Sequence, residues 1–88
     1  MSVTIGSQKI TPNVKDLGNT YILDFDVQIE RYKDTPSNQK IHVTMSCNKY
    51  KDKFVGKPPN VKVEKVEKTV QECVDEWVTQ HKNIYKIV

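Results

Sequence analysis

The chain has 88 residues, of which 36% are hydrophobic and 28% charged, and its formal net charge is +3. A chain of this length buries only about 60–65% of its unfolded surface, so we expect one modest core in a single domain over residues 1–88. No apolar segment approaches the ~20 residues needed to cross a bilayer, and no basic stretch precedes an apolar run, so we expect no signal peptide, no membrane partner and a cytoplasmic location.

The N-terminal fifth of the chain shows only weak patterns. Residues 3–5 are typical of a short edge strand, and Gly6-Ser7 of a turn. Residues 8–20 contain several turn-forming residues, so we expect a loop there, or a second short strand around Ile10.

Residues 21–32 form the clearest strand of the sequence. Every second side chain is apolar: Tyr21, Leu23, Phe25, Val27 and Ile29. Alternation with period two predicts one buried face and one wet face, as in an antiparallel sheet with water on one side.

A polar stretch, residues 33–39, follows and is predicted to be a hairpin loop because of its Pro-Ser-Asn centre. Residues 41–47 then form the return strand, with alternate apolar residues facing inward. His42 and Lys40 face outward on this strand. We therefore expect them near the acidic stripe of residues 24–30, where opposite charges on paired strands attract.

Residues 48–68 have the least regular pattern. A strand is expected to continue to about Val55, where Gly56 and Pro58-Pro59 end it. Residues 61–68 suit either a strand or the start of a helix from Asn60. We favour a strand to about Val66, because β-branched residues dominate the stretch and Thr69 marks a local helix start.

An amphipathic helix is predicted over residues 69–81. Its apolar side chains fall at helical spacing: Val70, Cys73, Val74, Trp77 and Val78. Thr69 and Glu72 have the spacing of a capping box, which satisfies two backbone donors of the first turn. Because the only Trp lies on the apolar face, we expect this helix to cover the core.

The last residues, 83–88, are apolar for a chain end. We expect them to add a last strand or to pack against the sheet edge, since apolar termini are usually docked. The alternative is a segment that docks onto a partner chain.

Cys47 and Cys73 are too few for a disulfide scaffold, and each falls on the apolar side of its element, so we interpret both as buried thiols. His42 and Cys47 face opposite sides of their strand, and Cys73 and His81 are too far apart for a dyad. No metal-ligand spacing and no glycine-rich phosphate loop is present. We therefore expect no catalytic residues, no metal, no cofactor and no enzymatic activity.

The stretch 49–68 is the one with functional character. It holds seven Lys and three acidic residues, with Tyr50 and Phe54 interleaved. Basic and aromatic residues together hold single-stranded nucleic acid without sequence readout. The competing interpretation is that the Lys residues only solubilise a hairpin while Tyr50 and Phe54 point into the core. The near absence of Arg counts against a dedicated nucleic-acid reader.

We therefore predict a small α+β domain, with an antiparallel meander of three to five strands and one C-terminal helix on one face. The expected function is a non-enzymatic binding or accessory module with a macromolecular partner, which we expect to be a protein. Weak, sequence-independent nucleic-acid binding through the 49–57 hairpin is the alternative. The sequence does not decide between a monomer and a homodimer. The candidate binding residues are Lys49, Tyr50, Lys51, Lys53, Phe54, Lys57, Ile84 and Tyr85.

Overall fold

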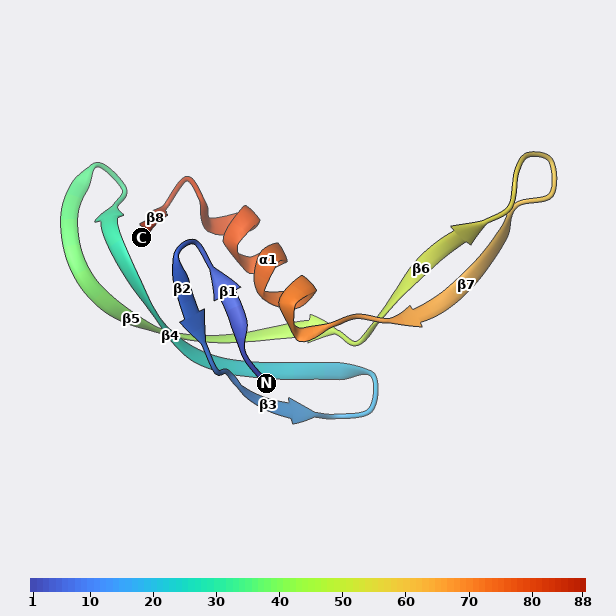
Figure 1. Cartoon of the computed structure of the whole chain (residues 1–88), viewed down its shortest axis with the longest axis horizontal. Helices are drawn as coiled ribbons and strands as arrows, with labels where there is room; N and C mark the ends of the chain where they lie inside the picture. Colours follow the sequence, from blue (N-terminus) through green and yellow to red (C-terminus); the bar gives the residue numbers. More distant parts are fainter.

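The computed structural model describes all 88 residues, Met1–Val88, as strands around a single helix (Figure 1). The elements are, in chain order, β1 (Val3–Ile5), β2 (Gln8–Ile10), β3 (Asn13–Asp16), β4 (Thr20–Tyr32), β5 (Thr35–Asn48), β6 (Tyr50–Val55), β7 (Lys62–Glu67), α1 (Val70–His81) and β8 (Tyr85–Ile87). They form three antiparallel sheets: β1–β2, a central sheet in which β4 contacts β3, β5 and β8, and β6–β7. The predicted α+β class is confirmed, and the central sheet has four strands.

The long hairpin of β4 and β5 is the framework of the body. Apolar residues alternate along β4 as predicted, and Leu23, Phe25, Val27 and Ile29 are buried. The predicted loop over 33–39 is wrong, because β5 begins at Thr35, which pairs with Tyr32. A two-residue turn suffices here, since Lys33 adopts a left-handed φ of 52°. The Pro-Ser-Asn stretch lies on the outermost strand of the sheet, where proline is tolerated.

On the side away from β5, β4 pairs with two separate short strands. β3 pairs with its first part and β8 with its last part. Between them, the Gln8 side-chain amide accepts from the backbone N–H of Gln28 and donates to its carbonyl, both at 2.9 Å. The expected short strand around Ile10 is present as β2. β3 was not predicted, because its four residues are all exposed and show no apolar alternation.

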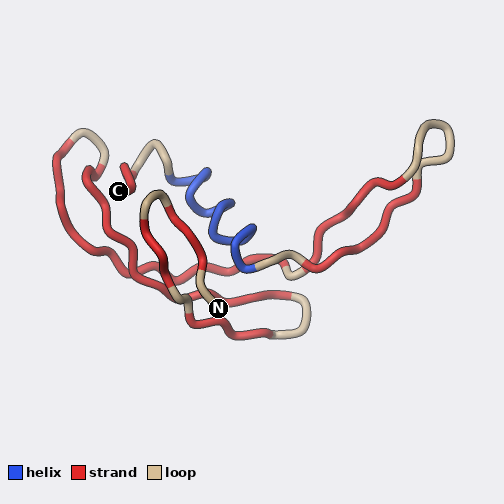
Figure 2. Tube along the Cα trace, in the orientation of Figure 1, coloured by secondary structure: helices blue, strands red, loops and turns tan.

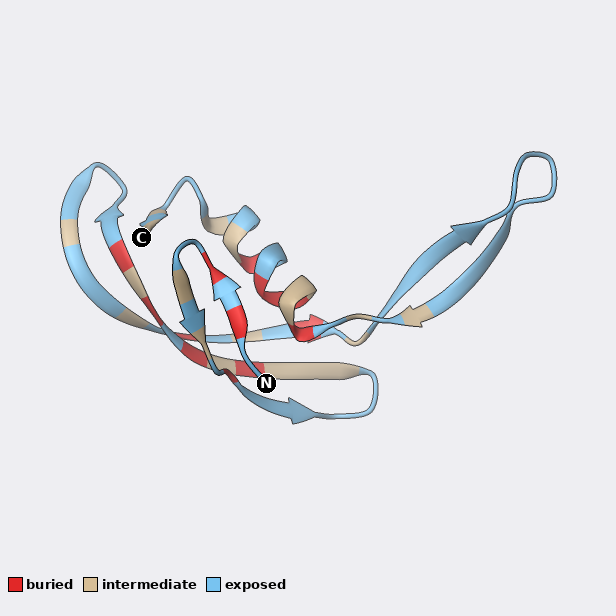
Figure 3. Ribbon diagram, viewed as in Figure 1, coloured by how far each residue is buried: buried red, intermediate tan, exposed pale blue.

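α1 packs over the concave side of this sheet, and its apolar face completes the core (Figure 3). Trp77 meets Phe25 edge to face, with ring centroids 5.8 Å apart. The capping box of Thr69 and Glu72 is present, so the predicted start of the helix is confirmed, as is the strand before it. The side-chain amide of Gln71 pairs with both backbone groups of Thr4, which ties α1 to β1.

The C-terminal residues are docked, as expected, through β8. The Tyr85 ring stacks on Trp77, and the carbonyl of Val88 accepts from the backbone N–H of Ser7 at 3.1 Å. Gly6 has a φ of 58°, and a Cβ there would collide with the same Val88 carbonyl. Glycine at this position therefore allows the first turn and the last residue to lie in contact.

One hairpin stands outside this body. β6 and β7 project from it as a separate two-stranded ribbon (Figure 2). The molecule measures 51 × 27 × 18 Å, with a radius of gyration of 15.8 Å. A compact chain of this length has a radius of gyration of about 12 Å, and the projecting hairpin accounts for much of the difference.

Candidate binding arm

The projecting hairpin, residues 50–67, is here called the arm, and its outer part, residues 53–63, the tip. Phe54 is 70% exposed, and Val63, directly opposite on β7, is 57% exposed. Tyr50 is also exposed, at 43%. The interpretation that Tyr50 and Phe54 point into the core is therefore wrong, because the arm has left the body and both of its faces meet solvent.

The base of the arm is fastened to the body by Lys49. Its Nζ lies 2.8 Å from Oδ2 of Asp16 and 3.5 Å from Oε1 of Glu67, and its side chain is only 14% exposed. The hydroxyl of Tyr21 also donates to Glu67, at 3.0 Å. One Lys side chain thus joins the β3 end of the body to the last residue of β7.

The charges at this base shift one another's pKa values. The hydrogen bond from Lys49, helped by the Gly18 backbone, lowers the pKa of Asp16, and the bond to Asp16 raises the pKa of Lys49. Partial burial, together with the bond to Glu67, raises the pKa of Tyr21. These pKa shifts keep Asp16 ionised and Lys49 protonated at neutral pH, so this ion pair persists there.

Two further ion pairs connect the base of the arm to α1. Lys51 pairs with Glu72, and this contact lowers the pKa of that carboxyl. Lys68 lies 2.7 Å from Glu76. The near end of the arm is thus held by charges of both signs, and its lysines are engaged.

The tip has the opposite character, because its lysines have no ion pair. Lys53, Lys57 and Lys62 contact no carboxylate within ion-pair distance, and residues 53–63 contain no acidic residue. The tip therefore has a formal charge of +3, and the rest of the chain sums to zero. The unpaired lysines of the arm thus lie at its tip, beside exposed apolar side chains.

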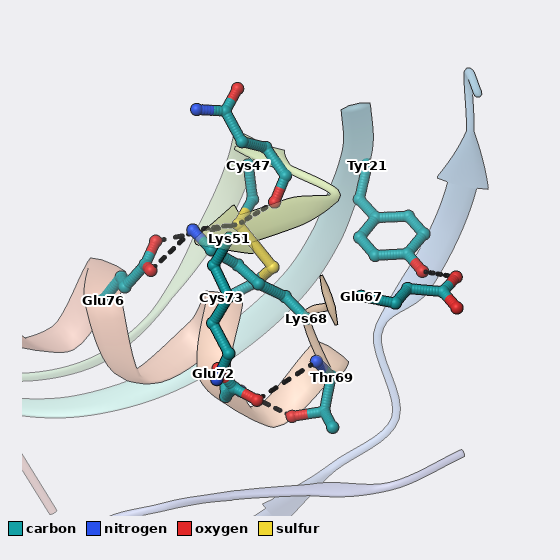
Figure 4. Close-up of a disulfide and its surroundings, with 10 residues drawn as sticks. Tyr21, Cys47, Lys51, Glu67, Lys68, Thr69, Glu72, Cys73 and Glu76 are labelled. Carbon is teal, nitrogen blue, oxygen red and sulfur yellow. Dashed lines mark hydrogen bonds and ion pairs between the residues drawn. A yellow bond between two sulfur atoms is a disulfide. The ribbon is translucent and has the colours of Figure 1, made fainter. Parts of the chain in front are cut away.

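A disulfide closes the base of the arm. Cys47 at the end of β5 and Cys73 in the first turns of α1 are bonded, with Cα atoms 5.9 Å apart (Figure 4). The interpretation of both residues as buried thiols is wrong. The inward face of β5 and the apolar face of α1 meet at this point, so the alternation that buries each sulfur also brings the two together.

The structure brings six of the eight predicted binding residues together and separates two. Those at residues 49–57 lie on the arm or at its base, although Lys49 and Lys51 are engaged in ion pairs. Ile84 and Tyr85 lie in the body, beside a hollow of about 550 Å³ that Arg31 and Lys82 also line. Sequence reasoning missed Lys62 and Val63 as site residues. Only the pairing of β6 with β7 places them beside Phe54 and Val55.

Elsewhere, one cluster of titratable groups stands out on the wet face of the central sheet. His42 lies between two carboxylates, with Nε2 2.5 Å from Asp24 and Nδ1 2.7 Å from Asp26. This agrees with the expected position of His42 beside the acidic stripe. No group of three or more His, Cys, Asp or Glu side chains is arranged to hold a metal ion. No helix has the length and apolar character needed to cross a membrane.

Comparison with protein-family models, curated proteins and solved structures finds no match to this chain.

Proposed function

We propose that the chain is a non-enzymatic binding module that engages a partner protein through the arm. The observation that carries the proposal is the exposure of Phe54 and Val63 as a facing pair on a ribbon that no other part of the chain covers. A two-stranded hairpin alone in water is at best marginally stable. Large apolar side chains held in solvent at the end of such a hairpin are typical of a contact surface.

The fastening of the arm supports a role in binding. Ion pairs from Lys49 and Lys51 and the Cys47–Cys73 bond hold both strands where they leave the body. A contact surface on a held support loses less conformational freedom on association than one on a free loop. The ion pairs and the disulfide lie at the base of the arm, and the free charges and exposed apolar side chains lie at its tip.

The disulfide bears on where this binding takes place. Disulfides persist in oxidising compartments and are rare in the cytoplasm, where thiols are kept reduced. In place of the cytoplasmic location expected from the sequence, we propose an oxidising compartment. Maleimide labelling of the protein taken directly from its host tests this, because a bonded pair reacts only after reduction.

The test of the function compares two full-length variants of equal charge change. In the tip variant, Phe54→Ser is combined with Lys53→Gln, Lys57→Gln and Lys62→Gln. In the control variant, Leu17→Ser is combined with changes to Gln at three exposed body lysines without ion pairs: Lys9, Lys15 and Lys40.

Partners captured by the oxidised wild-type protein are identified, purified and titrated against both variants. The tip variant is expected to lose binding by at least about tenfold, and the control to keep it. A partner that binds the tip variant as tightly as wild type contradicts the proposed function.

Nucleic-acid binding is the second candidate, favoured by the unpaired Lys53, Lys57 and Lys62 beside the exposed ring of Phe54. If the three lysines contact three phosphates of a single strand, the logarithm of the binding constant should fall with log[salt] with a slope of about −2. Fluorescence anisotropy with single-stranded DNA and RNA measures it. Affinity without this slope, or no binding at low salt, excludes this candidate.

A further inference from the structure

The hydrogen bonding of the arm shows which of its backbone groups are free. At its base, the N–H of Lys68 donates to the carbonyl of Lys49 at 2.7 Å, whereas the N–H of Lys49 donates to the carbonyl of Asn19. The bond from Lys68 places these two residues at the position of a hydrogen-bonded pair in the ladder. Such pairs alternate with non-bonded pairs along an antiparallel ladder. The register between Tyr50↔Glu67 and Val55↔Lys62 is regular. The backbone groups of Tyr50, Asp52 and Phe54 therefore point outward from β6.

No other strand uses these outward groups, because the β6–β7 sheet contains only two strands. The arm stands clear of the body along its outer half (Figure 1). An open edge with free N–H and C=O groups is where an extended segment of another chain adds as a strand. The edge of β6 thus has the backbone requirement for such an addition.

The two faces of the ribbon differ, because residues that pair directly point to the same side. One face presents the apolar side chains of Tyr50, Phe54 and Val63, and its acidic groups are already engaged: Asp52 with Lys65 at 3.2 Å, and Glu67 with Lys49. The charges on the other face are mainly basic, and its members are Lys51, Lys53, Val55, Lys62, Glu64 and Val66. A strand added here meets an apolar surface on one side and lysines on the other.

We propose that the outer edge of β6 accepts, as a third strand, an extended segment of the partner protein in which apolar residues alternate with acidic ones. The proposal rests on the function proposed above and names the chemistry of the segment that is bound. Alternation with period two sends the apolar side chains of that segment toward Phe54. Its acidic side chains then point toward Lys53 and the other lysines of the basic face.

The edge of β6 is favoured over that of β7 by its neighbours. An added strand beside β6 lies next to Phe54 on one face and to the unpaired Lys53 on the other. Beside β7, the basic face offers Lys62 together with Glu64. The carboxylate of Glu64 repels an acidic segment, so charge complementarity selects β6.

A pair of proline variants tests the edge directly. The N–H groups of Asp52 and Lys65 both point outward, from β6 and from β7, so proline at either position removes no bond of the ladder itself. Both changes remove the same Asp52–Lys65 ion pair. Asp52→Pro and Lys65→Pro therefore differ in which edge they block. They also change the net charge by +1 and −1, a difference that favours binding of an acidic peptide to Asp52→Pro and so opposes the expected loss. Circular dichroism establishes that both variants fold.

The probe is a labelled peptide of six residues, the length of β6, in which Glu and Val alternate. Its control has the same composition, with the Val residues grouped before the Glu residues. Fluorescence anisotropy with the oxidised full chain is expected to show that the alternating peptide binds at least about tenfold more tightly than the grouped one. Asp52→Pro should weaken the binding by about tenfold, whereas Lys65→Pro should leave it within about twofold.

Several results would overturn this proposal. They are equal loss in both proline variants, no loss in Asp52→Pro, or no binding of the alternating peptide below a Kd of about 1 mM. Tighter binding of single-stranded DNA than of the peptide would assign the basic face to nucleic acid instead. Lys53 is exposed, and Lys53→Gln leaves the backbone intact. This change should weaken binding of the alternating peptide, and an unchanged affinity counts against the proposal.

The two proposals fail separately. A captured partner that is lost in the tip variant but binds Asp52→Pro normally leaves the arm as the contact surface and excludes strand addition. A captured partner that binds the tip variant normally excludes the arm altogether.

Discussion

The side chain of His42 is held between two carboxylates on the wet face of the central sheet. Its hydrogen bond to Asp26 is the largest cause that raises its pKa above 6.5, and the charge of Asp24 adds to the effect. A raised folded-state pKa means that the folded protein holds the proton more tightly than the unfolded chain does. The stabilising contribution is therefore full below about pH 6.5 and is lost as pH rises through the folded-state pKa.

An NMR titration of the His42 ring should show a midpoint above 6.5, and Asp26→Asn should lower it. Asp52→Asn, which removes a carboxylate on the arm, should leave the midpoint unchanged. A wild-type midpoint at or below 6.5 would show that the two carboxylates do not hold the ring in solution.

Trp77 is the residue on which the packing of α1 depends. It is 7% exposed and contacts the rings of Phe25, His81 and Tyr85. Trp77→Ala should lower the free energy of unfolding by about 3–5 kcal/mol, because it leaves a large cavity under the helix. Urea denaturation measures this. Leu17→Ala, at an exposed position, serves as the control, and a near-neutral result for Trp77→Ala would contradict the assigned core.

At the scale of elements, the arm contributes little to the stability of the body. Phe54 packs against no core residue, so Phe54→Ser should change the free energy of unfolding by no more than about 0.5 kcal/mol. Leu23→Ala, in the buried centre of β4, should cost about 2–5 kcal/mol. Urea denaturation of both variants tests the contrast. A large loss for Phe54→Ser would mean that the tip folds back onto the body in solution.

Local patterns predicted the elements whose residues have a solvated side and a buried side. The alternation of β4 identified its element because it marks the side of the strand that is buried. The capping box of Thr69 identified α1 because it is a contact within the first turn of the helix. β3 gave no such signal, since its backbone pairs with β4 while its side chains remain in solvent. The turn at Lys33 lies within the predicted loop, but its length of two residues was not predicted, because no sequence pattern marks a lysine with a left-handed φ.

The sequence predicted which segment holds the candidate site, but not which of its side chains are exposed and unpaired. The density of lysines marked residues 49–57, yet the sequence does not show which of them have ion partners. Lys49 and Lys51 meet carboxylates from β3 and α1, and these contacts exist only in the folded chain. The exposure of Phe54 was likewise unpredictable, because an alternating strand looks the same whether its apolar side faces a core or solvent.

At the scale of the whole molecule, the Cys47–Cys73 bond is the strongest constraint on the chain. Its sequence separation is 26 residues, and a crosslink over such a loop restricts the unfolded chain. The double variant Cys47→Ser/Cys73→Ser should lower the free energy of unfolding by about 3–4 kcal/mol by the loop-entropy model. Urea denaturation of this variant, beside wild type with and without reductant, measures the loss. Equal midpoints for all samples would exclude the bond in solution.

The disulfide between Cys47 and Cys73 closes a loop of the chain that contains the entire arm. A single cut by a protease in the turn after Gly56 leaves two polypeptides, and the bond between Cys47 and Cys73 joins one to the other. The β6–β7 ladder and the charges around Lys49 then hold the severed ends in register. The cut protein therefore remains one covalent unit until the disulfide is reduced.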